Sequence, residues 1–184
     1  VVLRPADANE VAEAWRVIMG MRHDPVALVL TRQAVPTLDR ARYAPASGVG
    51  KGAYVLADPP QGLPEVIVIA SGSEVALAVD AYERPTGEGA AVRVVSMPSW
   101  ELFDRQPATY RDSVLPPEVR ARVAVEEAST MGWHRYVGTD GAVIGMHTFG
   151  ASAPLKALQT KFGFTPDAVI EAARDQLERR RDST

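Results

Sequence analysis

The chain has 184 residues, 46% of them hydrophobic and 23% charged, which is enough for one complete domain and part of another. Its net charge of −3 gives no general attraction to nucleic acids or anionic membranes, so we expect neither as a partner. Cysteine is absent, which excludes disulfides and thiolate metal sites, and no apolar run approaches the ~20 residues of a membrane span. These features favour a cytoplasmic protein.

The first expected elements are a strand at residues 1–3 and a helix that begins near Asp7. Glu10, three residues after Asp7, completes a pattern typical of a capping box, in which side chains satisfy the free N–H groups at a helix start. Helical spacing then predicts an inner face that is formed by Val11, Trp15 and Ile18.

The second expected strand, residues 26–30, is apolar throughout, as are strands that are covered on both faces of a parallel sheet. Such a strand needs neighbours, and the chain supplies too few of them. We therefore predict that residues 1–45 are the end of a larger α/β domain.

Residues 34–64 contain many Pro and Gly residues, which interrupt helices and strands. We interpret this segment as a linker with one short strand at 53–57.

Strands and helices alternate from Glu65 onward. We expect buried strands at residues 66–70, 92–95, 122–125 and 142–145, and helices at about 74–82, 131–136 and 166–177. This alternation predicts a mostly parallel sheet with helices on both faces. The predicted fold class is therefore α/β: a three-layer α/β/α domain over residues 46–184, preceded by the terminal strand-helix-strand of another α/β domain.

Arg32 is the first candidate binding residue. It follows the strand at 26–30, at the carboxyl end, where open α/β sheets bind ligands. Its guanidinium offers paired donors that match the oxygens of a phosphate. An Arg after a strand is also a common solvated or salt-bridged surface residue, and the pattern alone leaves both interpretations open.

Two further segments carry side chains that suit a site. The turn Ser71–Glu74 joins a strand to a helix with small residues, so its N–H groups suit an anion. Alternatively, Ser71 caps the helix and Glu74 reaches back to it. Glu126 and Glu127 end another strand, where one of them, but not both, is expected to act as acid, base or interface residue. The histidines lack metal-ligand spacing, so we do not expect a zinc site.

Several strings of residues are not generic. They are Leu30-Thr31-Arg32-Gln33, Ser71-Gly72-Ser73-Glu74-Val75, Val94-Val95-Ser96-Met97-Pro98-Ser99, Tyr110-Arg111-Asp112-Ser113-Val114-Leu115-Pro116, Ala121-Arg122-Val123-Ala124-Val125-Glu126 and Phe162-Gly163-Phe164-Thr165. In this order and at this spacing, the chain resembles transketolases from Leu3 to about Leu177. The resemblance implies that residues 1–45 end the domain that binds the pyrimidine of thiamine diphosphate. Residues 46–184 would form the carboxy-terminal domain.

The resemblance also implies an activity for the parent protein. Transketolases are cytoplasmic homodimers of the pentose phosphate pathway. They reversibly transfer a two-carbon ketol group from a ketose phosphate to an aldose phosphate, with thiamine diphosphate and a divalent metal, Mg or Ca, as cofactors. In the family, the Arg of the Leu-Ser/Thr-Arg-Gln string binds the phosphate of the sugar, and Arg32 holds that position here.

Other parts of the family's machinery are not found in this chain. They include the Gly-Asp-Gly segment that holds metal and diphosphate, and the Glu that activates the aminopyrimidine. We therefore assign no catalytic, cofactor-binding or metal-binding residue, and expect the chain alone to be inactive. The alternatives are a related enzyme, such as deoxyxylulose phosphate synthase or the β component of a 2-oxoacid dehydrogenase, and a non-catalytic dimerisation or ligand-binding module with its ligand at Ser71–Glu74.

Overall fold

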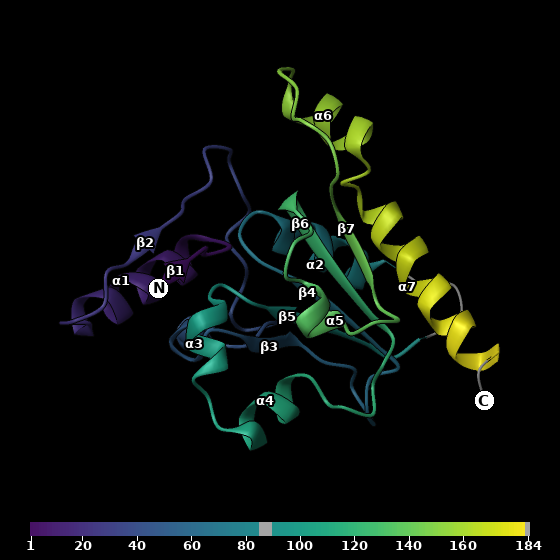
Figure 1. Cartoon of the computed structure of the whole chain (residues 1–184), viewed down its shortest axis with the longest axis horizontal. Helices are drawn as coiled ribbons and strands as arrows, with labels where there is room; N and C mark the ends of the chain where they lie inside the picture. Colours follow the sequence, from purple (N-terminus) through teal and green to yellow (C-terminus); the bar gives the residue numbers. More distant parts are fainter. Residues whose placement is uncertain (85–89, 183–184) are drawn as a thin grey trace.

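The computed structural model describes residues 1–84 and 90–182, which form two sheets with helices around them (Figure 1). The strands are β1 (Val2–Leu3), β2 (Ala27–Leu28), β3 (Tyr54–Ala57), β4 (Val66–Ala70), β5 (Val92–Ser96), β6 (Arg122–Ser129) and β7 (Ala142–Met146). The helices are α1 (Ala8–Gly20), the 3-10 helix η1 (Ala46–Lys51), α2 (Glu74–Glu83), α3 (Trp100–Asp104), α4 (Ala108–Val114), α5 (His134–Val137), α6 (Leu155–Phe162) and α7 (Pro166–Asp182).

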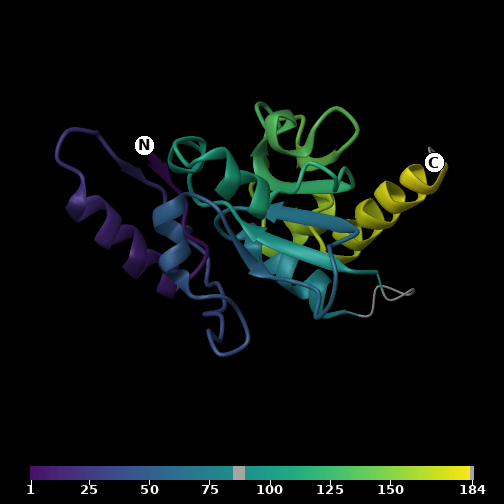
Figure 2. The same cartoon turned by 90° about the horizontal axis from the view of Figure 1, so that it is seen from below.

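The amino-terminal unit, residues 1–45, lies to one side of the larger sheet (Figure 2). Its strands β1 and β2 pair in parallel, with Val2 opposite Ala27. The strand expected at 26–30 is shorter than predicted. Val29 and Leu30 are 49% and 54% exposed, because β2 has only β1 as a hydrogen-bonded neighbour among the described residues. The predicted strand-helix-strand is confirmed, but its sheet contains only two strands among the described residues.

Helix α1 begins as the sequence predicts but turns a different face inward. The Asp7 Oδ1 atom accepts the N–H of Glu10 at 2.8 Å, which confirms the capping interaction. The buried positions of α1 are Glu10 and Ala14, whereas Trp15 is 51% exposed. The prediction that Trp15 faces inward was wrong, because polar contacts of Glu10, and not apolar spacing, fix the rotation of the helix.

Those polar contacts fasten α1 to the larger sheet. The Tyr54 hydroxyl of β3 and the Ser96 hydroxyl of β5 each donate a hydrogen bond of 2.7 Å to Glu10 Oε1. Burial raises the pKa of Glu10, although these hydrogen bonds act in the opposite direction. Arg40 binds both carboxylate oxygens of Asp7 at 3.0 Å and the Tyr54 hydroxyl at 3.1 Å. A buried polar network therefore joins the two units.

The larger sheet has the strand order β3-β5-β4-β6-β7, in which β3 is antiparallel to β5 and the other pairs are parallel. The four strands predicted after Glu65 are present, and β6 continues to Ser129. The short strand predicted at 53–57 is β3, at one edge of this sheet. The prediction of a mostly parallel sheet is confirmed.

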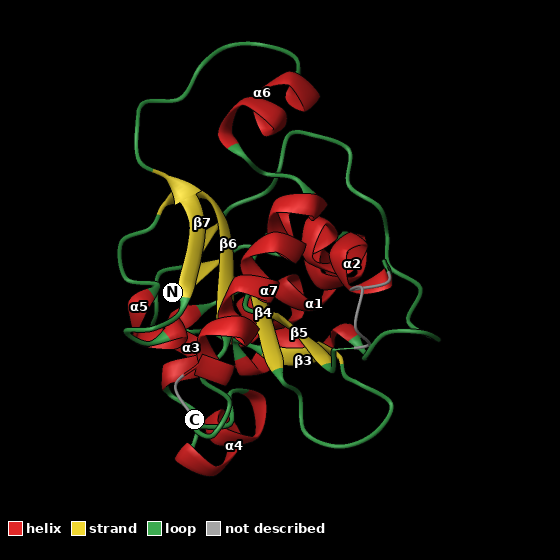
Figure 3. Cartoon of the chain, turned by 90° about the vertical axis from the view of Figure 1, so that its right-hand side faces the viewer, coloured by secondary structure: helices red, strands yellow, loops and turns green. Residues whose placement is uncertain are grey.

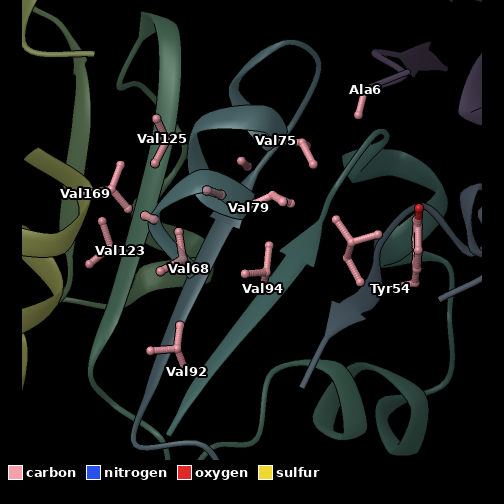
Figure 4. Packing of buried hydrophobic residues seen from close by; sticks show 14 of the residues in the cluster. Ala6, Tyr54, Val68, Val75, Val79, Val92, Val94, Val123, Val125 and Val169 are labelled. Carbon is pink, nitrogen blue, oxygen red and sulfur yellow. The ribbon is translucent and has the colours of Figure 1, made fainter. Parts of the chain in front are cut away.

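Side chains alternate between the two faces of this sheet. Val66, Val68 and Ala70 of β4 pack in one apolar cluster with residues of α2 and α7 (Figure 4). Ile67 and Ile69 belong to a second cluster with residues of α3, α4 and α5. Both faces are thus covered by helices, which confirms the predicted three-layer α/β/α arrangement.

The last helix, α7, starts as predicted: the Thr165 hydroxyl accepts the N–H of Ala168 at 3.2 Å, and Val169 and Ala173 are buried. The sequence did not predict α3, α4 or α6. Helix α6 contributes no buried residue; it follows the long loop after β7 and is joined to α7 by the short link 163–165 (Figure 3). Among the described residues, no helix has the length and apolar character needed to cross a membrane.

Candidate functional site

Arg32 lies in the loop that follows β2, beyond the carboxyl end of the parallel pair β1 and β2. Its side chain is exposed, and no hydrogen bond or ion pair ties it to the residues that the structure describes. Neighbouring Gln33 donates its N–H to Thr31 Oγ1 at 3.3 Å, so the loop makes a local turn here. Arg32 is therefore presented to solvent with all of its donors available.

The turn Ser71–Glu74 follows β4, at the point in the sheet where α/β folds of this type most often bind ligands. In the sheet, β4 lies between β5 and β6. The connection that leaves β4 leads to β5 on one side, whereas β6 pairs with β4 on the other side, so the strand order reverses between β4 and β6. In this chain the crevice is already filled. Gly72 donates its N–H to the carbonyl oxygen of Arg4 at 3.0 Å, and Arg4 donates its N–H to Pro98 at 2.8 Å.

The prediction that Ser71 caps α2 was wrong. Ser73 is the N-cap, and its side chain makes no capping hydrogen bond to the helix backbone. The carboxylate of Glu74 does lie at the helix start, where its Oε2 atom accepts the Ser73 hydroxyl at 3.3 Å. Its Oε1 atom accepts the N–H of Glu127 in β6 at 2.9 Å. The helix start is satisfied within the turn, where Val75 donates to Gly72 O at 3.3 Å, and the side chain of Glu74 is available to link strands.

Arg4 is the centre of a buried ionic cluster in this crevice. Its guanidinium forms an ion pair with Glu126, and its Nη2 atom lies 3.7 Å from Glu74 Oε1. The side chains of both glutamates are at least 96% buried, while Arg4 is 28% exposed. Burial raises the pKa of Glu74 to about 7; Arg4 opposes this rise, and the like charge of Glu126 adds to it. Two buried carboxylates therefore share one cation.

Glu126 and Glu127 point apart, as the sequence predicts for neighbours on a strand. Glu126 is buried against Arg4, whereas Glu127 Oε1 accepts a hydrogen bond of 3.1 Å from Gln159 of α6. The structure thus brings together Glu74 and Glu126 from the predicted set. Arg32 joins neither of them by a hydrogen bond or an ion pair.

Arg4 itself was not singled out from the sequence. It lies 122 positions from Glu126, and nothing in its local pattern differs from an ordinary charged residue at the end of a strand. The pairing depends on how the amino-terminal unit docks onto the sheet, which no local spacing encodes. A usable signal was the presence of two carboxylates at the carboxyl ends of strands that are buried on both faces, because buried charges require a counter-charge.

The described residues do not offer a metal centre. No group of three or more His, Cys, Asp or Glu side chains in residues 1–84 and 90–182 is arranged to hold a metal ion. The ionic cluster of Arg4, Glu74 and Glu126 supplies two carboxylates, but Arg4 already neutralises part of their charge. The divalent metal of the family does not fit these residues, and we derive no step through it.

Comparison with known proteins identifies the family. The profile described as "Transketolase-like TK C-terminal domain" matches residues 52–165. The transketolase of Geobacillus stearothermophilus is 49% identical over 176 residues, which cover 96% of this chain and 26% of that protein. The transketolase of Aquifex aeolicus is 51% identical over 168 residues, covering 91% of this chain and 24% of that protein. The chain thus spans about a quarter of the length of the curated relatives that it matches.

Solved structures give the same answer. The transketolase from Leishmania mexicana superposes with a TM-score of 0.88 at 43% identity, over 97% of this chain and 25% of that one. The transketolase from Pichia stipitis in complex with sedoheptulose-7-phosphate superposes with a TM-score of 0.87 at 37% identity, over 98% of this chain and 25% of that one. From its profile match, its relatives and its fold, the chain belongs to the transketolase family, with residues that match the carboxy-terminal domain.

Proposed function

We propose that this chain is the carboxy-terminal part of a transketolase, a transferase that moves a two-carbon ketol group reversibly from a ketose phosphate to an aldose phosphate. The identity of about one half to full-length transketolases supports this assignment. The same identity disfavours deoxyxylulose phosphate synthase and related enzymes. We further propose a cytoplasmic homodimer that acts in the pentose phosphate pathway and uses thiamine diphosphate with Mg or Ca.

The proposed domain arrangement follows from the two sheets. Residues 1–45 would end the pyrimidine-binding domain, because β1 and β2 form only a narrow pair with exposed apolar residues at its carboxyl end. Residues 46–184 would be the carboxy-terminal domain, with the connecting segment at about 34–64. Thiamine diphosphate and its metal would be held mainly by other segments of the whole enzyme. For that reason we expect no ketol transfer by the 184-residue chain alone.

A non-catalytic ligand-binding module with its ligand at Ser71–Glu74 is not favoured. The backbone and guanidinium of Arg4 already occupy that turn. A Cβ atom built on Gly72 would lie 3.8 Å from Arg4 Nη2, so the arginine covers the turn closely.

Arg32 carries the proposed substrate contact. The supporting observation is its position: an exposed guanidinium that makes no hydrogen bond or ion pair with residues 1–84 or 90–182, in the loop beyond the carboxyl end of a parallel strand pair. Such a group binds a phosphate with two parallel hydrogen bonds. The Pichia stipitis relative was solved with a sugar phosphate, which supports a phosphorylated substrate here as well.

Replacement of Arg32 in the whole enzyme tests this proposal. We expect Arg32→Ala to raise KM for phosphorylated sugars by about tenfold or more, since a hydrogen bond to a charged group contributes about 1.5–3 kcal/mol. With an acceptor that lacks a phosphate, the variant should behave like the wild type. Arg22→Ala, which removes another exposed arginine of the same unit, is the control. Equal kinetics of Arg32→Ala and wild type on phosphorylated sugars would contradict the phosphate role.

A further inference from the structure

Arg4 and the candidate binding residue Arg32 leave the same edge of the small sheet. Arg4 directly follows β1 and Arg32 lies in the loop after β2, and because the two strands are parallel, both residues lie beyond the carboxyl ends. Their surroundings differ: Arg32 is exposed, whereas the Arg4 side chain is 28% exposed and enters the crevice of the larger sheet. The strand that carries Arg4 is therefore paired with the strand that leads to Arg32.

The loop of Arg32 makes few contacts that fix its position. Among the described residues, residues 30–37 make one hydrogen bond with each other and none with the rest of the chain. The loop is held at its two ends, where Val29 donates its N–H to Leu3 O at 2.8 Å and Leu38 donates its N–H to the N-cap carboxylate of α1 at 2.9 Å. Val29 is the nearer of the two to Arg32 in the chain. The position of β1 therefore determines where the loop of Arg32 begins.

Backbone groups attach β1 to the larger sheet. Arg4 donates its N–H to Pro98 O at 2.8 Å, just beyond β5, and its carbonyl oxygen accepts the N–H of Gly72, just beyond β4, at 3.0 Å. A further, exposed hydrogen bond of 3.3 Å runs from the N–H of Val2 to Glu101. These bonds place the end of β1 at the carboxyl ends of β4 and β5, but none of them reaches β6.

The guanidinium of Arg4 supplies the attachment to β6. Its Nη1 atom forms an ion pair with Glu126 of β6, and its Nη2 atom lies 3.7 Å from Oε1 of Glu74, the first residue of α2. Both carboxylates are buried, and in such surroundings charged contacts are strong and unpaired charge is costly. A planar group that is held at two of its nitrogens keeps one orientation. The side chain thus fixes the end of β1 to α2 and to β6.

We propose that Arg4 is a positioning residue for sugar phosphate binding. Its guanidinium, held by Glu126 and Glu74, fixes the carboxyl edge of β1 and β2, and thereby the place from which Arg32 reaches the phosphate. This inference rests on the proposed phosphate role of Arg32, and Arg4 itself does not touch the substrate. Without the guanidinium, the two buried carboxylates repel each other and this edge is displaced. Even a small displacement of a binding group weakens its contact with the substrate.

Kinetics of the whole enzyme test the positioning role. We expect Arg4→Met to raise KM for phosphorylated sugars about fivefold and to change kcat by less than about twofold, because Arg32 is displaced and not removed. KM for an acceptor that lacks a phosphate should stay at the wild-type value. A role in stability alone would lower the fraction of active enzyme, and hence kcat, for all substrates alike without changing KM. Unchanged KM for phosphorylated sugars in Arg4→Met would overturn the proposal.

Arg93→Met is the matched control. Arg93 is also a buried arginine, with a side chain that is 8% exposed and an ion pair of 2.7 Å to Asp58. It lies near the start of β5, whereas Arg4 contacts Pro98 beyond the end of that strand. Loss of this cation should destabilise the enzyme but leave KM for phosphorylated sugars within about twofold of the wild type. An equal rise of KM in both variants would mean that any loss of stability disturbs the site, which rejects a specific role of Arg4.

A double-mutant cycle separates this inference from the proposed function. In the Arg32→Ala background, Arg4→Met should raise KM by less than about twofold, because the residue that it positions is already missing. Effects that multiply would reject the positioning role and leave the phosphate contact of Arg32 in place. If Arg32→Ala alone leaves KM unchanged, the phosphate role fails and the positioning role falls with it.

A milder variant decides if Arg4→Met does not fold. Arg4→Lys keeps the buried cation, but its single ammonium group cannot hold the two carboxylates at separate nitrogens, so KM for phosphorylated sugars should still rise about threefold. In the isotope-labelled 184-residue chain, nuclear magnetic resonance should show the amide signals of Arg32 and Gln33 shifted by Arg4→Lys but not by Arg93→Lys. Either an unmoved Arg32 signal or an unchanged KM in Arg4→Lys would reject the proposal.

Discussion

The buried position of Glu74 disfavours the charged form of its carboxylate. It is 2% exposed and lies beside Glu126, and the single arginine between them approaches Glu74 only to 3.7 Å. Its pKa is about 7 in the folded chain, against 4.5 as the ordinary value, with burial as the main cause. Between these two pH values the folded state binds more protons than the unfolded state does.

This difference predicts how stability depends on pH. The contribution of Glu74 to the free energy of unfolding should be largest below about pH 4.5 and should fall as pH rises to about 7, by about 3 kcal/mol at most. Glu74→Gln mimics the protonated form and keeps an oxygen for the N–H of Glu127. We expect the variant to flatten this part of the profile and to be at least as stable as the wild type at pH 8, as measured by urea unfolding at several pH values.

The exposed Glu118→Gln variant is the control for that experiment and should keep the wild-type profile. A Glu74→Gln variant that is less stable than the wild type at pH 8, with an unchanged slope, would mean that Glu74 is needed as an anion for Arg4.

At the scale of elements, the turn from η1 into β3 depends on one glycine. Gly52 has φ +84°, and a Cβ atom there would lie 2.1 Å from the backbone N of Phe103 and 2.5 Å from the carbonyl oxygen of Ser99. Its own carbonyl oxygen accepts the N–H of Ser99 at 2.9 Å. The turn is thus pressed against the start of α3, and neither the backbone conformation nor the space suits a side chain.

We expect Gly52→Ala to lower the free energy of unfolding by about 3 kcal/mol, through the left-handed conformation together with backbone crowding. Gly62→Ala separates these two causes. Gly62 has φ +75° but nothing within 4 Å of a Cβ atom, so it should lose only about 1 kcal/mol. Urea unfolding of both variants measures the difference. Equal losses would show that crowding at Gly52 is relieved at no cost.

The elements that the sequence predicted well are those whose burial is uniform along the strand or periodic along the helix. β4 is apolar at every position and buried at every position, and α7 has a cap, a first-turn proline and a regular apolar stripe. The helices α3, α4 and α6 were not predicted; they span five to eight residues, which display at most about two helical turns. The helix expected at about 131–136 is present only as the four-residue α5. Their positions depend on packing against other elements.

The candidate site could likewise be predicted only in part from the sequence. The position of Arg32 after a strand could be predicted, because the strand and the residues that follow it are close together in the chain. Its proposed role came from the family resemblance and not from spacing. The cluster of Arg4 with Glu74 and Glu126 could not be predicted from the sequence, because it joins the residue that follows β1 to residues of α2 and β6. Contacts of this range follow from the docking of one unit onto another.

For the whole molecule, this docking decides whether the two units fold together. A two-stranded sheet such as β1 and β2 is marginally stable at best by itself. Residues 1–45 are stabilised through contacts with the larger sheet, namely the ion pairs of Arg4 and the hydrogen bonds from Tyr54 and Ser96 to Glu10. Because these contacts are buried, loss of one unit exposes unpaired charge in the other.

We therefore predict one cooperative unfolding transition for the chain. In a urea titration followed by nuclear magnetic resonance, amide signals of α1 and of β4 should disappear at the same midpoint. Arg4→Met should lower this common midpoint by an equivalent of about 3 kcal/mol, since it leaves two carboxylates buried without their cation. Arg16→Met, which removes an exposed arginine paired with Glu13 on α1, should change it by less than about 0.5 kcal/mol. If α1 signals of the wild type vanish at lower urea than those of β4, the buried network does not couple the units, and the amino-terminal unit is held only by its local contacts.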